Sequence, residues 1–359
     1  MKKVILILAA VLLIAGIGGG VWFWYAMQQP LYQPGMVRAG TNLSASLAPP
    51  PSADGDYWTV ENGIRLYHFA AGAGRNVLVV HGGPGFPFAQ PLKGLDALTT
   101  RYRFHYYDQR GSGKSSRPID QFTSSNYYEN MQSLDRTLGI GAQIADIERI
   151  RQILGDEKII LIGHSFGGFL ASLYAAEFPE HVQALILVAP AEVLVMPPES
   201  GGLFAQVKPL LPEEVQKEYD AYLKRYLDYG SIFGRSEGEL AALNAEFARY
   251  YSVAASRKGF ALPTDSDGSA AGGWMVHAMY MSMGLQHDYR AALQAVRAPV
   301  LVIHGEKDLQ PEKASRMYSD LFPNAEFRVI ANSGHFVFED QPEAFAQVVR
   351  EWLVGSGQW

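Results

Sequence analysis

The chain has 359 residues, of which 48% are hydrophobic and 18% are charged, and its formal net charge is -6. This composition provides enough apolar material for one large domain with an insertion, or for two domains. The acidic balance and the lack of a Lys/Arg run argue against a nucleic-acid partner. The chain has no cysteine, which excludes disulfides, thiol catalysis and cysteine metal sites.

A charge-free stretch from Val4 to Met27 follows two lysines at the N-terminus. As a helix rising about 1.5 Å per residue it would reach about 36 Å, enough to cross a hydrocarbon core of about 30 Å. We therefore predict a transmembrane anchor or signal segment over residues 1–27, with the rest of the chain outside the cytoplasm. In the signal-peptide alternative, cleavage near Gly18 or Gly20 would release a secreted protein.

Residues 28–56 are rich in Pro, Ser, Ala and Gly and show no sustained period, which predicts a linker. Two short apolar runs follow, Tyr57 to Val60 and Ile64 to Phe69, separated by an Asn-Gly turn signal that favours a hairpin.

Apolar runs of strand length then alternate with helical patterns. Strands are predicted at Asn76–Val80, Arg103–Tyr107, Lys158–Ile162, Ala184–Val188, Pro299–Ile303 and Glu326–Ile330, and helices at Gly141–Leu154, Phe166–Glu177, Glu312–Leu321 and Pro342–Leu353. Such alternation predicts an α/β domain, a mostly parallel twisted sheet with helices on both faces. Residues 191–297 show only helix-like stretches, which predicts a helical cap inserted between two parts of the core, 57–190 and 298–359.

The strongest chemical signal is Gly-His-Ser-Phe-Gly at residues 163–167, directly after a predicted strand and before a predicted helix. In a Gly-x-Ser-x-Gly sequence of this context the serine sits on a sharp strand-to-helix turn. We therefore predict that Ser165 is a nucleophile.

A serine hydroxyl needs a base to take its proton, and His335 is the candidate because it follows the last predicted strand. Asp308, in the loop after an earlier strand, is predicted to orient the imidazole. Glu306 in the same loop is the rival acid. The chain order Ser, Asp, His is that of the α/β-hydrolase fold.

Acyl transfer also needs hydrogen-bond donors for the developing oxyanion. The backbone N–H of Phe166, directly after the serine, is one candidate. The loop His-Gly-Gly-Pro-Gly at residues 81–85 follows a predicted strand, and its glycines allow close backbone approach. We assign the second donor to Gly83.

Two other chemistries are disfavoured. Gly111 to Ser115 resembles the end of a phosphate-binding loop, but Asp108 stands where that motif requires a glycine. No ligand spacing typical of a zinc site occurs. No cofactor and no metal are therefore predicted.

Three motifs together resemble the proline iminopeptidase family, the serine aminopeptidases of peptidase family S33. They are the loop at residues 81–85, Asp-Gln-Arg-Gly-Ser-Gly-Lys-Ser at residues 108–115, and the serine turn. The resemblance covers about residues 57–190 and 298–353 and implies removal of an N-terminal residue, often proline, from a short peptide. It also implies that cap carboxylates hold the substrate's free amine.

The cap departs from that pattern. Its return segment, Met275 to His287, contains no acid, and its glutamates are each expected on a solvated helix face. These are Glu213, Glu214, Glu218, Glu237, Glu239 and Glu246. The Met- and Tyr-rich segment could line an apolar acyl pocket or belong to the core.

Three functions therefore stay open. The first is an aminopeptidase acting on short peptides. The second is a carboxylic-ester hydrolase, lipase-like or esterase-like. The third is a non-catalytic, membrane-tethered binding module, although such a module has no need of a complete triad. An Asp nucleophile, as in epoxide hydrolases, is disfavoured because the turn carries Ser165.

Overall fold

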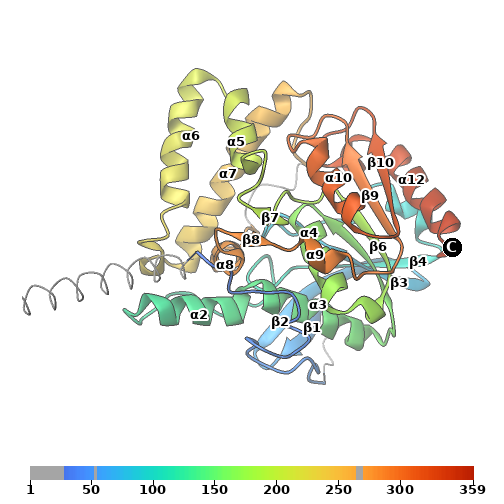
Figure 1. The fold of residues 1–359 in the computed structure, drawn as a ribbon, viewed down its shortest axis with the longest axis horizontal. Coiled ribbons are helices and arrows are strands. Elements are labelled where there is room, and N and C mark those ends of the chain that lie inside the picture. The colour runs from blue at the N-terminus through green and yellow to red at the C-terminus, as the bar shows by residue number, and fades with distance from the viewer. Residues whose placement is uncertain (1–27, 52–54, 264–269) are drawn as a thin grey trace, which may run out of the picture.

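A computed structural model describes residues 28–51, 55–263 and 270–359, and its centre is an eight-stranded sheet (Figure 1). The strand order is β1-β2-β4-β3-β5-β6-β9-β10. β2 runs antiparallel to both of its neighbours, and the pairs from β4 to β10 are all parallel. The strands are β1 (Tyr57–Glu61), β2 (Ile64–Gly72), β3 (Arg75–Val80), β4 (Tyr102–Tyr107), β5 (Ile159–His164), β6 (Val182–Val188), β9 (Val300–Gly305) and β10 (Ala325–Ile330).

Helices cover both faces of this sheet, as the alternation in the sequence predicts. The helices are α2 (Tyr127–Leu138), α3 (Ile140–Leu154), α4 (Phe166–Glu177), α5 (Gly202–Val207), α6 (Glu213–Tyr226), α7 (Glu237–Arg257), α8 (Trp274–Met283), α9 (Arg290–Leu293), α10 (Glu312–Leu321), α11 (Val337–Asp340) and α12 (Pro342–Gly355). α3, α4 and α10 pack in one apolar cluster, whereas α11 and α12 pack in the other.

The central strands supply both clusters because their side chains alternate between the two faces. In β3, Leu78 and Val80 belong to the cluster of α3 and α4, and Val77 and Val79 belong to the cluster of α12. Burial on both sides explains why these strands read as continuous apolar runs in the sequence.

The cap rises from the sheet after β6, with α5, α6 and α7 standing apart from the core (Figure 1). The sequence predicts only helices here, but the structure adds a two-stranded ribbon of β7 (Val195–Met196) and β8 (His287–Asp288). These strands are too short to show a period in the sequence. The ribbon joins the beginning of the insertion to its end.

Residues 28–51, predicted as part of a linker, lie against the domain. The carboxylate of Glu177 at the end of α4 accepts the Tyr32 hydroxyl at 2.9 Å and the backbone N–H groups of Gly35 and Arg38 at 2.8 and 3.0 Å. Tyr32 and Val37 are buried. Composition predicts the lack of regular structure in this segment, but not the distant carboxylate that holds it.

The predicted membrane-anchored localisation, with the catalytic domain outside the cytoplasm, needs correction. Within the described residues, no helix combines the length and the apolar character that crossing a bilayer requires. α7 has 21 residues, but charged side chains interrupt it. The stretch that suggested the anchor, residues 1–27, lies outside the described residues.

Candidate active site

Ser165 occupies the turn between β5 and α4, with a φ of 55° and a ψ of -122°. A positive φ is uncommon for a residue with a side chain and often marks a functional site. The glycines beside it are needed for space: a Cβ on Gly167 would lie 2.1 Å from the carbonyl oxygen of Val80, and a Cβ on Gly163 would lie 2.5 Å from that of Gly167. The close passage of β3, β5 and α4 thus explains the sequence around the serine.

His335 and Asp308 come together from the loops after β10 and β9. Nδ1 of His335 lies 2.8 Å from Oδ2 of Asp308, and both side chains are buried. The backbone N–H of Gln310 donates to the other carboxylate oxygen at 3.0 Å. Burial alone would raise the pKa of Asp308, but the neighbouring His335 and its hydrogen bond leave that pKa below the usual value.

The rival acid does not contact the histidine. Glu306 accepts the backbone N–H of Asn332 at 2.9 Å at the surface of the same loop. The carboxylate on Nδ1 of His335 leaves Nε2 as the ring nitrogen that can act on another group. Ser165 and His335 line the same cavity.

This cavity has a volume of about 320 Å³ and lies between core and cap. The core contributes aromatic side chains, among them Phe86, Phe88 and Phe338, and the cap contributes Phe247 and Tyr251 of α7. Among the described residues that line it, Glu339 is the one acid, and its carboxylate lies 2.7 Å from Nζ of Lys93. The wall that the structure describes is therefore mostly apolar, with its single carboxylate already paired.

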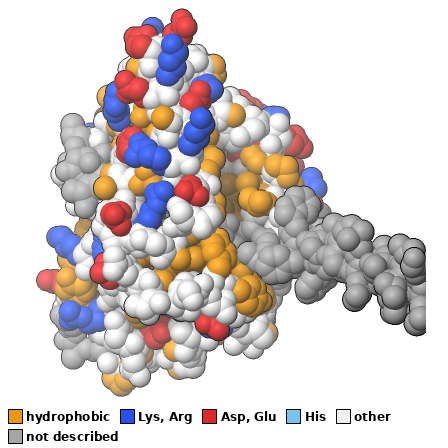
Figure 2. Space-filling view, turned by 90° about the vertical axis from the view of Figure 1, so that its left-hand side faces the viewer, with side chains coloured by type: hydrophobic (Ala, Val, Ile, Leu, Met, Phe, Trp, Pro, Cys, Tyr) orange, Lys and Arg blue, Asp and Glu red, His pale blue; other side chains and the backbone are white. Residues whose placement is uncertain are grey.

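The cap glutamates lie elsewhere, and none of the six lines the cavity. Glu218 and Glu246 form ion pairs with Arg249 and Arg225. Acidic and basic side chains are interspersed in this way over the molecular face shown in Figure 2. Glu237 is buried but accepts the backbone N–H groups of Gly273 and Trp274 and pairs with Arg117, so its role is structural.

The glycine loop after β3 lies against the serine turn. A Cβ on Gly82 would be 2.7 Å from Cβ of Ser165 and 3.3 Å from the backbone nitrogen of Phe166. Gly82 and Gly83 both line the cavity with Ser165. The structure thus brings both predicted oxyanion donors, at Gly83 and Phe166, to the same place as the serine.

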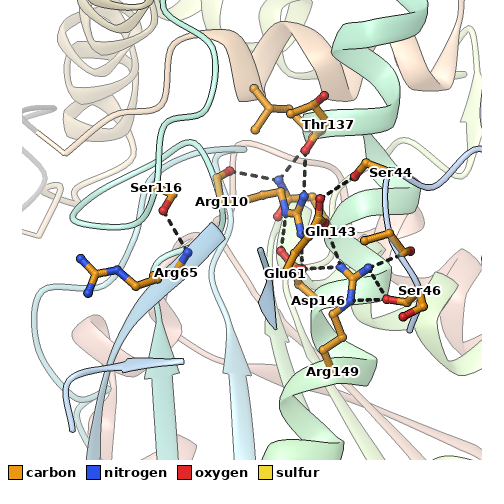
Figure 3. Close-up of polar contacts among 12 residues, drawn as sticks. Ser44, Ser46, Glu61, Arg65, Arg110, Ser116, Thr137, Gln143, Asp146 and Arg149 are labelled. Atoms are coloured by element: carbon orange, nitrogen blue, oxygen red, sulfur yellow. Dashed lines mark hydrogen bonds and ion pairs between the residues drawn. The ribbon is translucent and has the colours of Figure 1, made fainter. Parts of the chain in front are cut away.

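A buried ionic cluster supports the loop at residues 108–115 (Figure 3). Arg110 donates to Asp146 through Nε at 2.6 Å and Nη2 at 2.5 Å, and Arg149 donates to the same carboxylate at 3.1 Å. Glu61 at the end of β1 lies 3.2 Å from Nη2 of Arg110. Of these residues only Arg110 belongs to a motif that the sequence analysis singles out, and the pairing could not be predicted because it joins segments far apart in the chain.

The loop at residues 108–115 is closed by hydrogen bonds between its own residues. Oδ2 of Asp108 accepts the backbone N–H of Lys114 at 2.7 Å, and the Ser115 hydroxyl donates to the Asp108 carbonyl at 2.6 Å. In the described part of the chain, no three His, Asp or Glu side chains gather in a way that could hold a metal ion.

Most of the chain is similar in sequence to known proteins. Residues 75–342 match the family described as alpha/beta hydrolase fold. A proline iminopeptidase of Heyndrickxia coagulans is 27% identical over 288 residues, which cover 79% of this chain and 91% of the relative.

Solved structures of related proteins have the same fold. A proline iminopeptidase-related protein of Thermus thermophilus has a TM-score of 0.53 at 26% identity, covering 83% of this chain and 96% of that one. An esterase of Exiguobacterium antarcticum has the same TM-score at 19% identity, covering 84% and 100%, and so shares the fold. The predicted fold class and the resemblance to proline iminopeptidases are confirmed, and the chain belongs to the α/β-hydrolase fold family.

Proposed function

We propose that this hydrolase is a serine hydrolase that works through an acyl-enzyme, with Ser165 as nucleophile, His335 as base and Asp308 as the orienting carboxylate. The observation that carries the proposal is the 2.8 Å contact between Nδ1 of His335 and the carboxylate of Asp308. The same His335 lines a cavity together with Ser165, whose backbone has a positive φ. A buried carboxylate on Nδ1 fixes the tautomer that leaves Nε2 free to accept a proton.

In this mechanism the Ser165 hydroxyl attacks a carbonyl carbon while Nε2 of His335 takes its proton. The oxygen of the tetrahedral intermediate accepts hydrogen bonds from the backbone N–H groups of Gly83 and Phe166. Collapse of the intermediate expels the alcohol or amine, which receives the proton from His335. Water then attacks the acyl-enzyme by the same route and releases the acid.

For the substrate we propose a carboxylic ester with an apolar acyl group. The described wall of the cavity offers aromatic and aliphatic contacts, and its one carboxylate is paired with Lys93. A substrate ammonium would need an anion there, because burying an unpaired charge is costly. We also propose that residues 191–297 act as a cap over the core segments 57–190 and 298–359.

Aminopeptidase activity on short peptides is the second candidate, since the relatives include proline iminopeptidases along most of their length. The two candidates therefore need a direct test.

The test compares four substrates on the full-length protein: p-nitrophenyl butyrate, p-nitrophenyl acetate, prolyl p-nitroanilide and its N-acetylated form. Ester cleavage with no requirement for a free amine supports the first candidate. Cleavage confined to prolyl p-nitroanilide would favour the aminopeptidase. Ser165→Ala is the control: turnover that survives it in a homogeneous sample would contradict the serine mechanism itself.

A further inference from the structure

His81, the first residue of the glycine loop, is fully buried, and both of its ring nitrogens have hydrogen-bond partners. The backbone N–H of Gln109 points at Nε2 at 3.0 Å, and Nδ1 lies 3.0 Å from the carbonyl oxygen of Gly82. A backbone N–H can only donate and a carbonyl can only accept. The ring is therefore neutral, with its proton on Nδ1. Its environment agrees, because burial lowers the pKa of His81 to about 4.

This tautomer makes the ring a donor to the Gly82 carbonyl. The peptide between Gly82 and Gly83 is trans, since the cis bond in this loop is the next one, between Gly83 and Pro84. In a trans peptide the C=O and the following N–H point in opposite directions. A carbonyl of Gly82 turned toward His81 therefore turns the N–H of Gly83 away from that ring.

The direction matters because Ser165 lies against Gly82: a Cβ added to Gly82 would be 2.7 Å from Cβ of Ser165. Gly83 has a φ of 113°, which glycine adopts readily because it lacks a Cβ, so side-chain sterics at Gly83 do not fix the orientation of this peptide. The holding contacts on the Gly82 carbonyl are the His81 ring and the backbone N–H of Phe86 at 3.2 Å.

Gln109 holds His81 in turn from two sides. Besides its backbone N–H on the ring, its side-chain Nε2 donates to the His81 carbonyl at 2.8 Å. The Gln109 side chain is fully buried, and the backbone carbonyl of Gln109 accepts the Ser112 hydroxyl at 2.9 Å. The loop at residues 108–115 is thus hydrogen-bonded to the loop at residues 81–85 through Gln109 and His81.

We propose that His81 and Gln109 are a positioning pair that aims the Gly83 N–H at the oxyanion formed on the substrate of Ser165. The inference rests on the proposed serine mechanism and assigns the family loop at residues 108–115 a task in catalysis. Neither side chain touches the substrate; both act through the Gly82–Gly83 peptide.

The decisive comparison is between His81→Leu, which removes the donor to Gly82, and His81→Asn, whose amide nitrogen reaches about the position of Nδ1. Complete loss of one oxyanion donor costs about 10²- to 10³-fold in kcat. We expect His81→Leu, which misdirects that donor, to lower kcat by roughly 10- to 100-fold with little change in KM. His81→Asn should recover most of this loss.

A second readout is inhibition by an aryl trifluoromethyl ketone, which forms a tetrahedral adduct with the serine and places an oxyanion in the site. Its affinity should weaken in parallel with kcat in His81→Leu, and less so in Gln109→Leu, which loses the side-chain contact but keeps the backbone N–H on the ring. If His81→Leu does not fold, Gln109→Leu carries the same test.

His105→Leu is the matched control, because His105 is also buried, bonds Asn76 at 2.9 Å and does not line the cavity. It should lose thermal stability without losing ketone affinity. Unchanged ketone affinity in His81→Leu, or equal losses in His81→Leu and His81→Asn, would overturn the positioning role. Absence of Ser165-dependent turnover in the unaltered protein would instead overturn the proposed function.

Discussion

Nε2 of His164 lies 3.0 Å from the backbone carbonyl oxygen of His335, so the residue before the serine is bonded to the residue expected to be its base. The carbonyl can only accept, and Nε2 of His164 therefore carries a proton. Burial lowers the pKa of His164 to about 3, which keeps the ring neutral. The end of β5 and the loop after β10 are thus fixed to each other directly at the site.

Replacing His164 should therefore disturb catalysis more than folding. His164→Leu removes the donor and frees the His335 loop to shift, and a misplacement of about 1 Å can cost about 10²-fold in rate. We expect a fall in kcat of roughly that order or less, with KM little altered. His164→Gln, which can still donate, should retain more activity in steady-state kinetics. Equal activities for the two variants would argue against this bond.

Asp308→Asn tests the orienting carboxylate. The amide cannot serve as the same anionic acceptor for Nδ1, and the equivalent change in a well-studied serine protease lowers kcat by about 10⁴-fold. We expect a loss of 10³-fold or more, on the order of that reference value, for this protein. Glu306→Gln is the matched control, because Glu306 bonds Asn332 and not His335. A larger loss in the control would transfer the role to Glu306.

Much of this site follows from local sequence, and the rest does not. The turn at Ser165 is readable because a strand, a small-residue motif and a helix follow one another within about twenty residues. The hydrogen bond between Gln109 and His81 joins two loops whose residues are 28 positions apart. Hydrophobic periodicity in the sequence cannot predict a contact of this kind. The same holds for Glu177, whose carboxylate organises residues 32–38 from over 130 positions away.

Helix α2 is an element that the sequence pattern does not predict. Its residues are mostly polar, with Met131, Leu134 and Leu138 buried on one side. Such a helix gives a weak apolar signal in a sequence that otherwise reads as loop. In the structure it begins at the cap Asn126, whose side chain accepts the N–H groups of Tyr128 and Glu129, and it packs on α8.

Buried neutral histidines predict a loss of stability in acid. Burial lowers the pKa of His81 to about 4, and that of His164 and His277 to about 3. Unfolded histidines titrate near 6.5, so between about pH 6.5 and 4 the unfolded chain binds protons that the folded chain does not. The contribution of these histidines to stability therefore rises with pH in this window, by up to about 1.4 kcal/mol per histidine per pH unit. Burial raises the pKa of Asp108 to about 6, and this carboxyl contributes with the opposite sign.

Urea unfolding at several pH values between 7 and 4.5 measures this slope. His277→Phe is the informative variant, because the His277 ring lies among tyrosines, with no hydrogen-bond partner for either nitrogen among the described residues. The free energy of unfolding of His277→Phe should change less steeply with pH than that of the unaltered protein, by up to about 1.4 kcal/mol per pH unit. Identical slopes would mean that His277 is not buried as the structure places it.

The ionic cluster around Asp146 predicts a large stability effect. Asp146→Asn leaves Arg110 and Arg149 buried without their shared carboxylate, while Glu61 contacts both only at 3.2 and 3.5 Å. Removing one partner of a buried ion pair costs about 3–5 kcal/mol, whereas an exposed pair contributes about 1 kcal/mol or less. Urea unfolding should show the larger loss for Asp146→Asn and almost none for Glu218→Gln, whose partner Arg249 is exposed.

The response of Asp146→Asn to salt gives a second test. Because the buried arginines cannot reach water without opening the β1–β2 hairpin and α3, added salt should not restore the stability of Asp146→Asn. Recovery in high salt would show that these charges are solvated, and it would remove the argument that the cluster holds the loop at residues 108–115 in place.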